Sequence, residues 1–247
     1  MRIIISPAKK MKETDILPWQ DLPVYLEETR QILRWMQWLG MEEAKALWRC
    51  NDKLVAENYS RFRDMKPESA LSPAILSYDG IQYQYMAPAV FETDMLCYIQ
   101  EHLRILSGFY GVLKPLDGVT PYRLEMQAKT LVDGIRGLYD FWGRKLYDDV
   151  IDESHVIINL ASKEYSKCIE PYLQPEDRFI TCIFGEEING KLVQKGVYAK
   201  MARGEMVRFM AENKITDAEA MKQFCGLNYR FREDLSTRTK LVYTIAS

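Results

Sequence analysis

Short apolar runs along the chain indicate strands. RIIIS (2–6) is rich in β-branched residues and ends before Pro7, which predicts a buried strand followed by a loop. HVIINLA (155–161) is the clearest buried strand, and TKLVYTI (239–245) predicts a last one. RFITCIFGEEINGKLVQKG (178–196) reads as two strands joined at Asn189-Gly190, a pair typical of hairpin turns. AILSYDGIQYQYM (74–86) is expected to form a strand, a turn and a further extended piece.

Other segments have apolar residues at helical spacing. Between 22 and 65 the first such series is Leu22, Leu26, Ile32, Leu33, Met36 and Leu39, and Gly40 ends it. Residues 41–48 and 51–65 predict two more helices, the second with Asn51 as its N-cap. Further helices are expected over 92–106 (running into a short strand), 138–153, 162–169 (capped by Ser162) and 197–214.

Strands and helices mix without strict alternation, and no repeat or linker divides them. The pattern predicts an α/β (mixed α+β) fold, with a mixed sheet surrounded by helices. Because 247 residues are enough for one large core, we expect a single domain over 1–247.

Composition narrows the function classes. The 33 Lys and Arg residues against 35 Asp and Glu residues give a net charge of −2, so any nucleic-acid binding must use a local basic patch. No segment resembles a signal peptide or a membrane span, and no membrane partner is expected. The five cysteines are odd in number and contain no C-x-x-C pair, which favours a reducing cytoplasm.

The common cofactor and nucleophile motifs are absent, including G-x-G-x-x-G, the P-loop, H-E-x-x-H and G-x-S-x-G. With only two histidines, we predict no metal site and no cofactor. His155 opens an apolar strand and reads as structural, whereas His102 beside Glu101 is expected to be solvated.

Two segments place polar groups just after predicted strands. SPAKK puts Ser6 and Lys9 past the end of the first strand, where α/β sheets line ligand crevices; the alternative is a turn with solvated lysines. NLASKEY puts Asn159 at the end of a strand and Ser162 at the start of a helix. Free N–H groups at such a junction suit an anion, and simple helix capping is the alternative.

Two more segments combine cations with unusual backbone. In AKMARGEMVRF, Lys200, Arg203 and Gly204 share a helix face, so either an anion or a tightly packed neighbour approaches the backbone there. In PYRLEM, Arg123 and Glu125 point to one side of an extended segment, as a cleft lining or as a buried pair.

Together the four segments predict an anion-binding crevice. Lys9 and Glu125 are the candidates for acid–base chemistry, and Glu164 is a further possible acid. The turn-rich stretch LSGFYGVLKPLDGVT just upstream of PYRLEM adds Ser107, Tyr110 and Lys114 to the crevice.

As a set, four segments resemble the signature blocks of the bacterial YaaA family of peroxide stress resistance proteins: ISPAK, LSGFYGVLKPLDGVTPYRLEM, NLASKEY and YAKMARGEMVRF. The resemblance implies a cytoplasmic protein that lowers free iron and oxidative DNA damage. It also implies an unusual mixed α/β fold with a positively charged cleft that binds DNA.

The resemblance further implies a helix–hairpin–helix element like that of DNA repair proteins. HLRILSGFYGVL is similar to it, with Gly108 and Gly111 as the turn glycines that let backbone N–H groups reach a phosphate. This chain departs from that pattern at Pro115 and Asp117-Gly118, which would cut the second helix short.

Three functions are compatible with these observations. The first is DNA binding through the basic cleft, to duplex or distorted DNA. The second is an enzyme acting on a small anionic substrate such as a nucleotide or nucleobase. The third is direct iron sequestration, for which the acidic pairs at 148–149 and 152–153 lack the spacing of a hard metal site.

Overall fold

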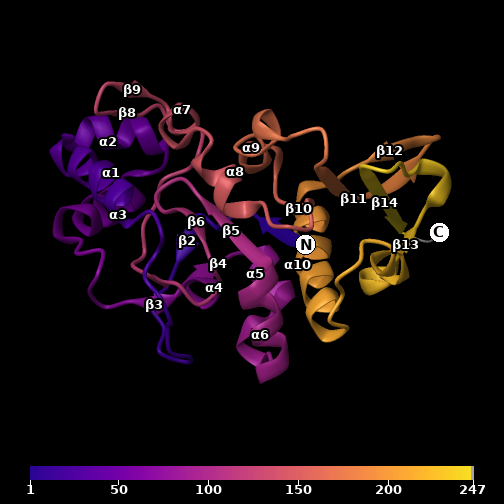
Figure 1. Cartoon of the computed structure of the whole chain (residues 1–247). Coiled ribbons are helices and arrows are strands. Elements are labelled where there is room, and N and C mark those ends of the chain that lie inside the picture. Colours follow the sequence, from indigo (N-terminus) through magenta and orange to yellow (C-terminus); the bar gives the residue numbers. More distant parts are fainter. Residues whose placement is uncertain (246–247) are drawn as a thin grey trace.

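A computed structural model describes residues 1–245. Within these residues, the main sheet contains eight strands, seven of them in the order β13-β14-β11-β10-β1-β5-β6, and β12 pairs with β11 (Figure 1). Its strands are β1 Arg2–Ile5, β5 Leu103–Ser107, β6 Gly111–Leu113, β10 Val156–Leu160, β11 Arg178–Ile188, β12 Lys191–Val193, β13 Tyr229–Phe231 and β14 Lys240–Ile245.

The centre of this sheet is parallel and its edges are antiparallel. β1 pairs in parallel with β10 on one side and with β5 on the other. β10 and β14 both run parallel to β11, whereas β6, β12 and β13 form antiparallel edges. The predicted mixed α/β fold is therefore confirmed, and the carboxyl ends of β1 and β10 meet at one edge of the sheet.

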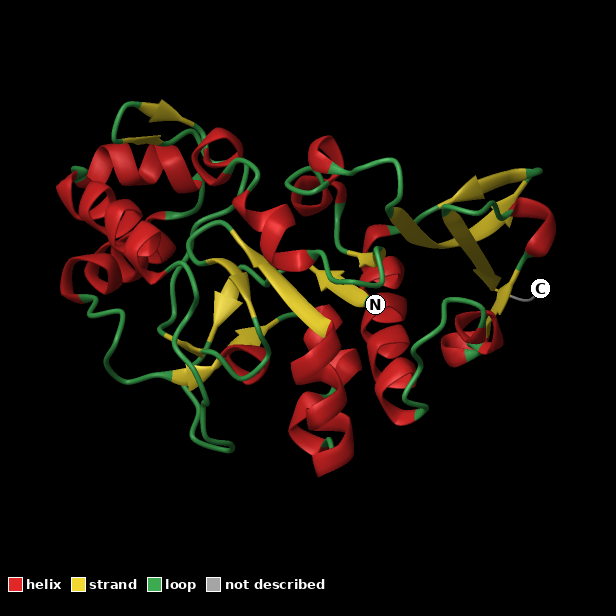
Figure 2. Ribbon diagram, viewed as in Figure 1, coloured by secondary structure: helices red, strands yellow, loops and turns green. Residues whose placement is uncertain are grey.

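Helices and two-stranded ribbons surround the sheet (Figure 2). The helices are α1 Leu26–Trp38, α2 Met41–Trp48, α3 Asp52–Asp64, α4 Ala74–Ser77, α5 Ile81–Met86, α6 Thr93–His102, α7 Leu138–Trp142, α8 Lys145–Val150, α9 Lys163–Ser166 and α10 Gly196–Glu212. The ribbons are β2 Lys10–Met11 with β4 Tyr78–Asp79, β3 Ser72–Pro73 with β7 Gly118–Val119, and β8 Leu131–Val132 with β9 Ile135–Arg136.

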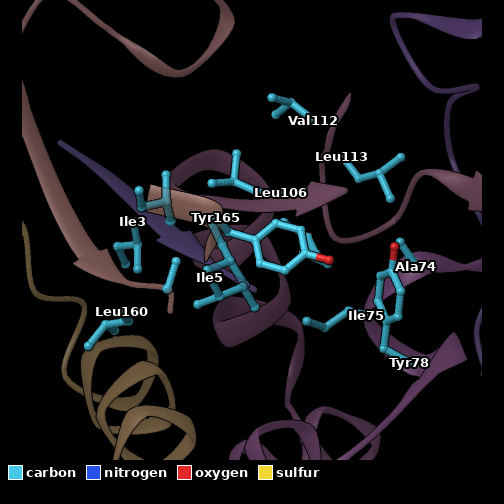
Figure 3. Close-up of a cluster of buried hydrophobic side chains, with 14 of the residues drawn as sticks. Ile3, Ile5, Ala74, Ile75, Tyr78, Leu106, Val112, Leu113, Leu160 and Tyr165 are labelled. Atoms are coloured by element: carbon cyan, nitrogen blue, oxygen red, sulfur yellow. The ribbon is translucent and has the colours of Figure 1, made fainter. Parts of the chain in front are cut away.

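The core fills the space between the central strands and the segment at 74–78. Figure 3 shows Ile3, Ile5 and Leu160 on one side of Tyr165, and Ile75 and Tyr78 on the other. All five of those side chains are buried, as expected for apolar residues on both faces of a parallel sheet. Among residues 1–245, no helix is both long and apolar enough to cross a membrane.

Most predicted elements are present. Asn51 caps α3 by accepting a hydrogen bond from the Leu54 amide at 3.0 Å. Residues 92–106 form α6 and then β5, as expected. Asn189 and Gly190 both have positive φ, at 51° and 72°, which joins β11 to β12 as the predicted hairpin.

Three element predictions were wrong. Residues 74–86 form two helices around the short β4, because Gln82, Tyr83 and Met86 bury one helical face. The first helix starts at Leu26 rather than Leu22, which precedes Pro23 and so disfavours the helical conformation. The helix expected over 138–153 is broken into α7 and α8 at Gly143, where φ is 51°.

The prediction that His102 is solvated was also wrong. Its side chain is buried rather than solvated, and its Nδ1 lies 2.9 Å from the Met1 carbonyl oxygen. His155 is partly exposed and pairs with Asp177 at 2.8 Å, in keeping with a structural role.

Candidate functional site

A pocket of about 500 Å³ lies where the four polar segments meet. Ser6 and Lys9 reach it from the loop after β1, and Ser162 from the loop after β10. Arg123 and Glu125 reach it from an extended segment, and Arg203 with Lys200 from α10. The remaining lining residues are Pro7, Ala8, Lys10, Asp79, Gly80, Ile81, Gln82, Tyr83, Tyr122, Leu124, Glu164 and Tyr165.

Ser6 joins the two strand ends at the base of the pocket. Its Oγ accepts a hydrogen bond from the Ser162 amide at 2.8 Å and donates one to the Ser162 hydroxyl at 3.2 Å. The Tyr83 hydroxyl donates to the Ser6 carbonyl at 2.9 Å. Ser162 is the N-cap residue of α9, but its side chain does not accept a capping hydrogen bond as predicted. Because the Ser162 amide already donates to Ser6, it is not free to bind an anion. Ser6 and Ser162 instead hold the loops after β1 and β10 together.

One carboxylate serves two cations at the mouth of the pocket. Oε1 of Glu125 lies 3.1 Å from Lys9 Nζ and 3.2 Å from Arg123 Nη2. The side chains of Arg123 and Glu125 are only 14% and 13% exposed, whereas that of Lys9 is 66% exposed. Lys10 pairs separately with Asp79 at 2.6 Å. Because Arg123 shares its carboxylate with Lys9, the positive charge at this mouth is only partly neutralised.

Arg203 is a half-buried cation that lacks a counter-ion in the described part of the chain. Within residues 1–245 it forms no ion pair, and its Nε is buried with no hydrogen-bond partner. Burial lowers the pKa of Arg203 below its usual value, and only the Cys182 thiol opposes this effect. Lys200, one helical turn earlier, is exposed on the same face. A desolvated guanidinium at a pocket wall is costly unless an anion joins it, so the wall is suited to a phosphate or carboxylate.

Glu164 can supply acid–base chemistry. Burial raises the pKa of Glu164, and the charge of Glu125 adds to this, while the Gln127 and Met126 amides and Lys9 oppose it. Its Oε1 accepts a hydrogen bond from the Gln127 amide at 3.3 Å. A carboxyl group whose pKa is raised beside a second carboxyl group is an arrangement that general acids use.

Tyrosines line the pocket and were missed by the sequence argument as site residues. Tyr83, Tyr122 and Tyr165 all face it, and burial raises the pKa of each phenol. The Tyr122 hydroxyl lies 2.6 Å from Ser107 Oγ and 2.9 Å from the Tyr78 hydroxyl. Tyr122 lies in PYRLEM and Tyr165 in NLASKEY. Their positions in these two segments were the sequence signal that could have identified them as site residues.

Several predicted site residues lie outside this pocket. Ser107 is buried, and its Oγ accepts hydrogen bonds from the amides of Phe109 and Tyr110. Tyr110 is also buried, and its hydroxyl accepts a hydrogen bond from the Thr120 amide at 3.1 Å. Asn159 accepts from the Ala161 amide and donates to Thr181. The polar side chains of Ser107, Tyr110 and Asn159 thus have hydrogen-bond partners within the protein, as is typical of structural residues.

Four further predicted site residues do not line the pocket: Lys114, Gly108, Gly111 and Gly204. Lys114 lines a different hollow, together with Arg2 and Arg104. A Cβ atom on Gly108 would lie 2.6 Å from the Leu124 carbonyl, and Gly111, with φ of 76°, packs against Trp142. Gly204 faces α5 rather than the pocket, so the tight-packing alternative describes it correctly.

The helix–hairpin–helix expectation was wrong for this chain. Residues 103–113 form β5 and β6, which pair antiparallel from Ile105 with Leu113 to Ser107 with Gly111. Every residue of both strands is buried in the main sheet, so Gly108 and Gly111 cannot present amides to a phosphate. Gly108 instead lets the 122–126 segment pack closely and reach the pocket.

Comparison with known proteins identifies the family of this chain. A family model described as "Peroxide stress protein YaaA" matches residues 1–235. A protein of Agathobacter rectalis named UPF0246 protein is 57% identical over 244 residues, covering 98% of each chain. Another of that name from Limosilactobacillus reuteri is 53% identical over 247 residues, covering 99% of each. This chain therefore belongs to the YaaA family of peroxide stress proteins.

Proposed function

We propose that this protein acts in the cytoplasm during peroxide stress, binds DNA through the pocket, and thereby limits iron-driven oxidative damage. The observation that carries the proposal is that four separate segments bring five cations and two carboxylates to one pocket, to which β4 adds Asp79. Membership of the peroxide stress family supports the stress role. DNA binding is supported by the excess of cations and by the unpaired Arg203.

The charge distribution makes this binding local. The chain as a whole carries a net charge of −2, so its surface does not attract DNA in general. Lys9, Lys200 and Arg203 would make the phosphate contacts. Among residues 1–245, Lys200 and Arg203 form no ion pair, and the exposed Lys9 shares the Glu125 carboxylate with Arg123. Affinity would then fall steeply as salt concentration rises, with a slope set by the number of phosphate contacts.

A fluorescence titration at several salt concentrations tests this proposal. Duplex, bubble and single-stranded DNA are titrated with wild type and with the Lys200→Ala and Arg123→Ala variants. Lys191→Ala is the matched control, because Lys191 is an exposed lysine of β12 that does not line the pocket. We expect salt-sensitive binding that both pocket variants weaken and the control does not. Binding that ignores both pocket variants would exclude this pocket as the DNA site.

A second candidate is an enzyme that acts on a small anionic substrate such as a nucleotide or nucleobase. The observation in its favour is Glu164, whose pKa is raised beside Glu125 in a pocket large enough for such a molecule. Turnover would require the proton on Glu164, so Glu164→Gln would abolish it while ligand affinity changed little. A screen of nucleotides by product analysis tests this, and a fully active Glu164→Gln variant would reject it.

The proposed effect on iron is indirect. Among residues 1–245, no group of three or more His, Cys, Asp and Glu side chains is placed to hold a metal ion. In the acidic segment at 148–153, Asp148 pairs with Arg144, and Asp152 pairs with the Met1 amine. The proposal therefore assigns the protection to DNA contacts rather than to storage of iron.

A further inference from the structure

A second hollow of about 410 Å³ opens beside the pocket. Lys9, Arg123 and Glu125 line both spaces, so the shared ion pairs form the boundary between them. The second hollow adds Arg49 and Lys129, which makes four cations against one carboxylate. We call it the basic groove, defined by Lys9, Arg49, Arg123, Glu125 and Lys129.

Hydrogen bonds of the main chain and of Trp48 place the two new cations. The indole Nε1 of buried Trp48 donates to the Arg123 carbonyl oxygen at 2.6 Å, which fixes the end of α2 against the pocket segment. Arg49 is the next residue. Lys129 follows a turn in which the Ala128 amide donates to the Glu125 carbonyl oxygen at 3.1 Å. Both cations are thus held beside the Glu125 bridge.

The new cations are available to a ligand. Arg49 and Lys129 are exposed, and in the described part of the chain neither lies within ion-pair distance of a carboxylate. Arg49 also has left-handed backbone angles, with φ of 47° and ψ of 49°, which is costly for a residue other than glycine. The chain therefore keeps an arginine at a position where glycine would be less strained.

The two spaces differ in chemistry. The basic groove offers cations at an open surface, whereas the pocket is lined by the largely buried side chains of Tyr83, Tyr122 and Tyr165 and by Arg203. A ligand that fills both must carry successive negative charges and, next to them, a planar apolar group. Single-stranded nucleic acid has this composition, since its phosphates follow a basic groove while its bases stack on aromatic side chains.

We propose that an unpaired stretch of nucleic acid spans both spaces, with its phosphates on Arg49 and Lys129 and one base inside the pocket. This inference rests on the proposed function, because it assumes that the pocket binds nucleic acid. It adds two phosphate-contacting residues and a place for the base. It also predicts a preference for bubble or single-stranded DNA over intact duplex, in which no base is free to enter.

The first test is the salt dependence of binding to a short thymidine oligonucleotide. Arg49→Gly removes the charge at a position whose backbone suits glycine, so the fold is retained. We expect Arg49→Gly and Lys129→Ala each to reduce the slope of log affinity against log salt by about 0.7, and the double variant by about 1.4. Arg49→Lys is expected to restore most of the slope, and Lys191→Ala to leave it unchanged.

The second test concerns the base. An oligonucleotide with the same phosphates but no bases should keep the wild-type salt slope and bind about 5-fold or more weakly. Equal affinity for the abasic and normal oligonucleotides would overturn the placement of a base in the pocket. If the groove variants kept the wild-type salt slope but Lys200→Ala bound more weakly, the basic groove would be rejected as a phosphate site. The proposed function would still stand. No binding by wild type would instead reject the proposed function itself.

Discussion

Replacing Gly204 by alanine tests how α10 is held against α5. A Cβ atom at Gly204 would lie 2.1 Å from the carbonyl oxygen of Gln82 and 2.9 Å from the amide nitrogen of Met86. Nonbonded carbon atoms pack at about 3.5–4.0 Å, so the two helices would have to separate by more than about 1 Å. The obstructing atoms belong to the backbone of α5, which cannot rotate away as a side chain can.

The expected sign is opposite to that of an ordinary glycine in a helix. Alanine normally stabilises a helix interior by about 1 kcal/mol relative to glycine. Overpacking a tight contact costs about 1–3 kcal/mol, and a backbone obstacle favours the upper end. We therefore expect Gly204→Ala to lower the free energy of unfolding by about 1–2 kcal/mol, which is a fall in melting temperature of about 2–8 °C.

Gly196→Ala is the matched control, in the first turn of the same helix. No atom lies within 4 Å of a Cβ placed at Gly196, so alanine meets no obstacle there. Its effect should be neutral or stabilising, by at most about 1 kcal/mol. Urea unfolding followed by tryptophan fluorescence, with thermal melts by circular dichroism, measures both variants. If Gly204→Ala were as stable as Gly196→Ala, the close packing of α5 on α10 would be refuted.

Three further substitutions have defined outcomes. Trp48→Phe leaves the Arg123 carbonyl oxygen without its hydrogen-bond donor. We expect the free energy of unfolding in urea to fall by about 1–3 kcal/mol and single-stranded DNA to bind more weakly. Unchanged affinity would argue against Trp48 as an anchor of the site. Burial raises the pKa of Asp117 from 3.8 to about 7, so the folded state keeps a proton that the unfolded state loses, and stability falls as pH rises from about 4 to 7. Asp117→Asn should remove that part of the slope in unfolding curves across this range, and an unaltered slope would contradict the assignment. Glu125→Gln frees both of its cations, so DNA should bind more tightly in salt titrations, and weaker binding would indicate that the carboxylate itself serves the ligand.

The main sheet could be predicted because its strands have few alternatives. Runs such as 2–5 and 156–160 are apolar at nearly every position, which only a strand covered on both faces satisfies at that length. Residues 74–86 misled the same reasoning, since α4 and α5 are short helices. They are held by tertiary contacts such as the packing of α5 on Gly204 rather than by a long periodic pattern.

The candidate site was predictable where strand ends and charges coincide. Ser6, Lys9, Arg123 and Arg203 line the pocket. Each was visible in the sequence as a polar residue after a strand, in an extended segment or on a helix face. Arg49 could not be found this way. It reaches the basic groove only through the hydrogen bond of Trp48 to a carbonyl 75 residues away, which no local pattern encodes.

The wide separation of the site's segments along the chain has a consequence for synthesis. Ser6 is synthesised well before Arg203, yet both line the same pocket. At roughly 5–20 residues per second, the ribosome completes the lining of that pocket roughly 10–40 s after the first segment emerges. A nascent chain cannot hold a ligand during this interval, and neither can a fragment that ends before α10. Ligand binding would therefore report that translation has passed α10 and that the newly made chain has folded around it.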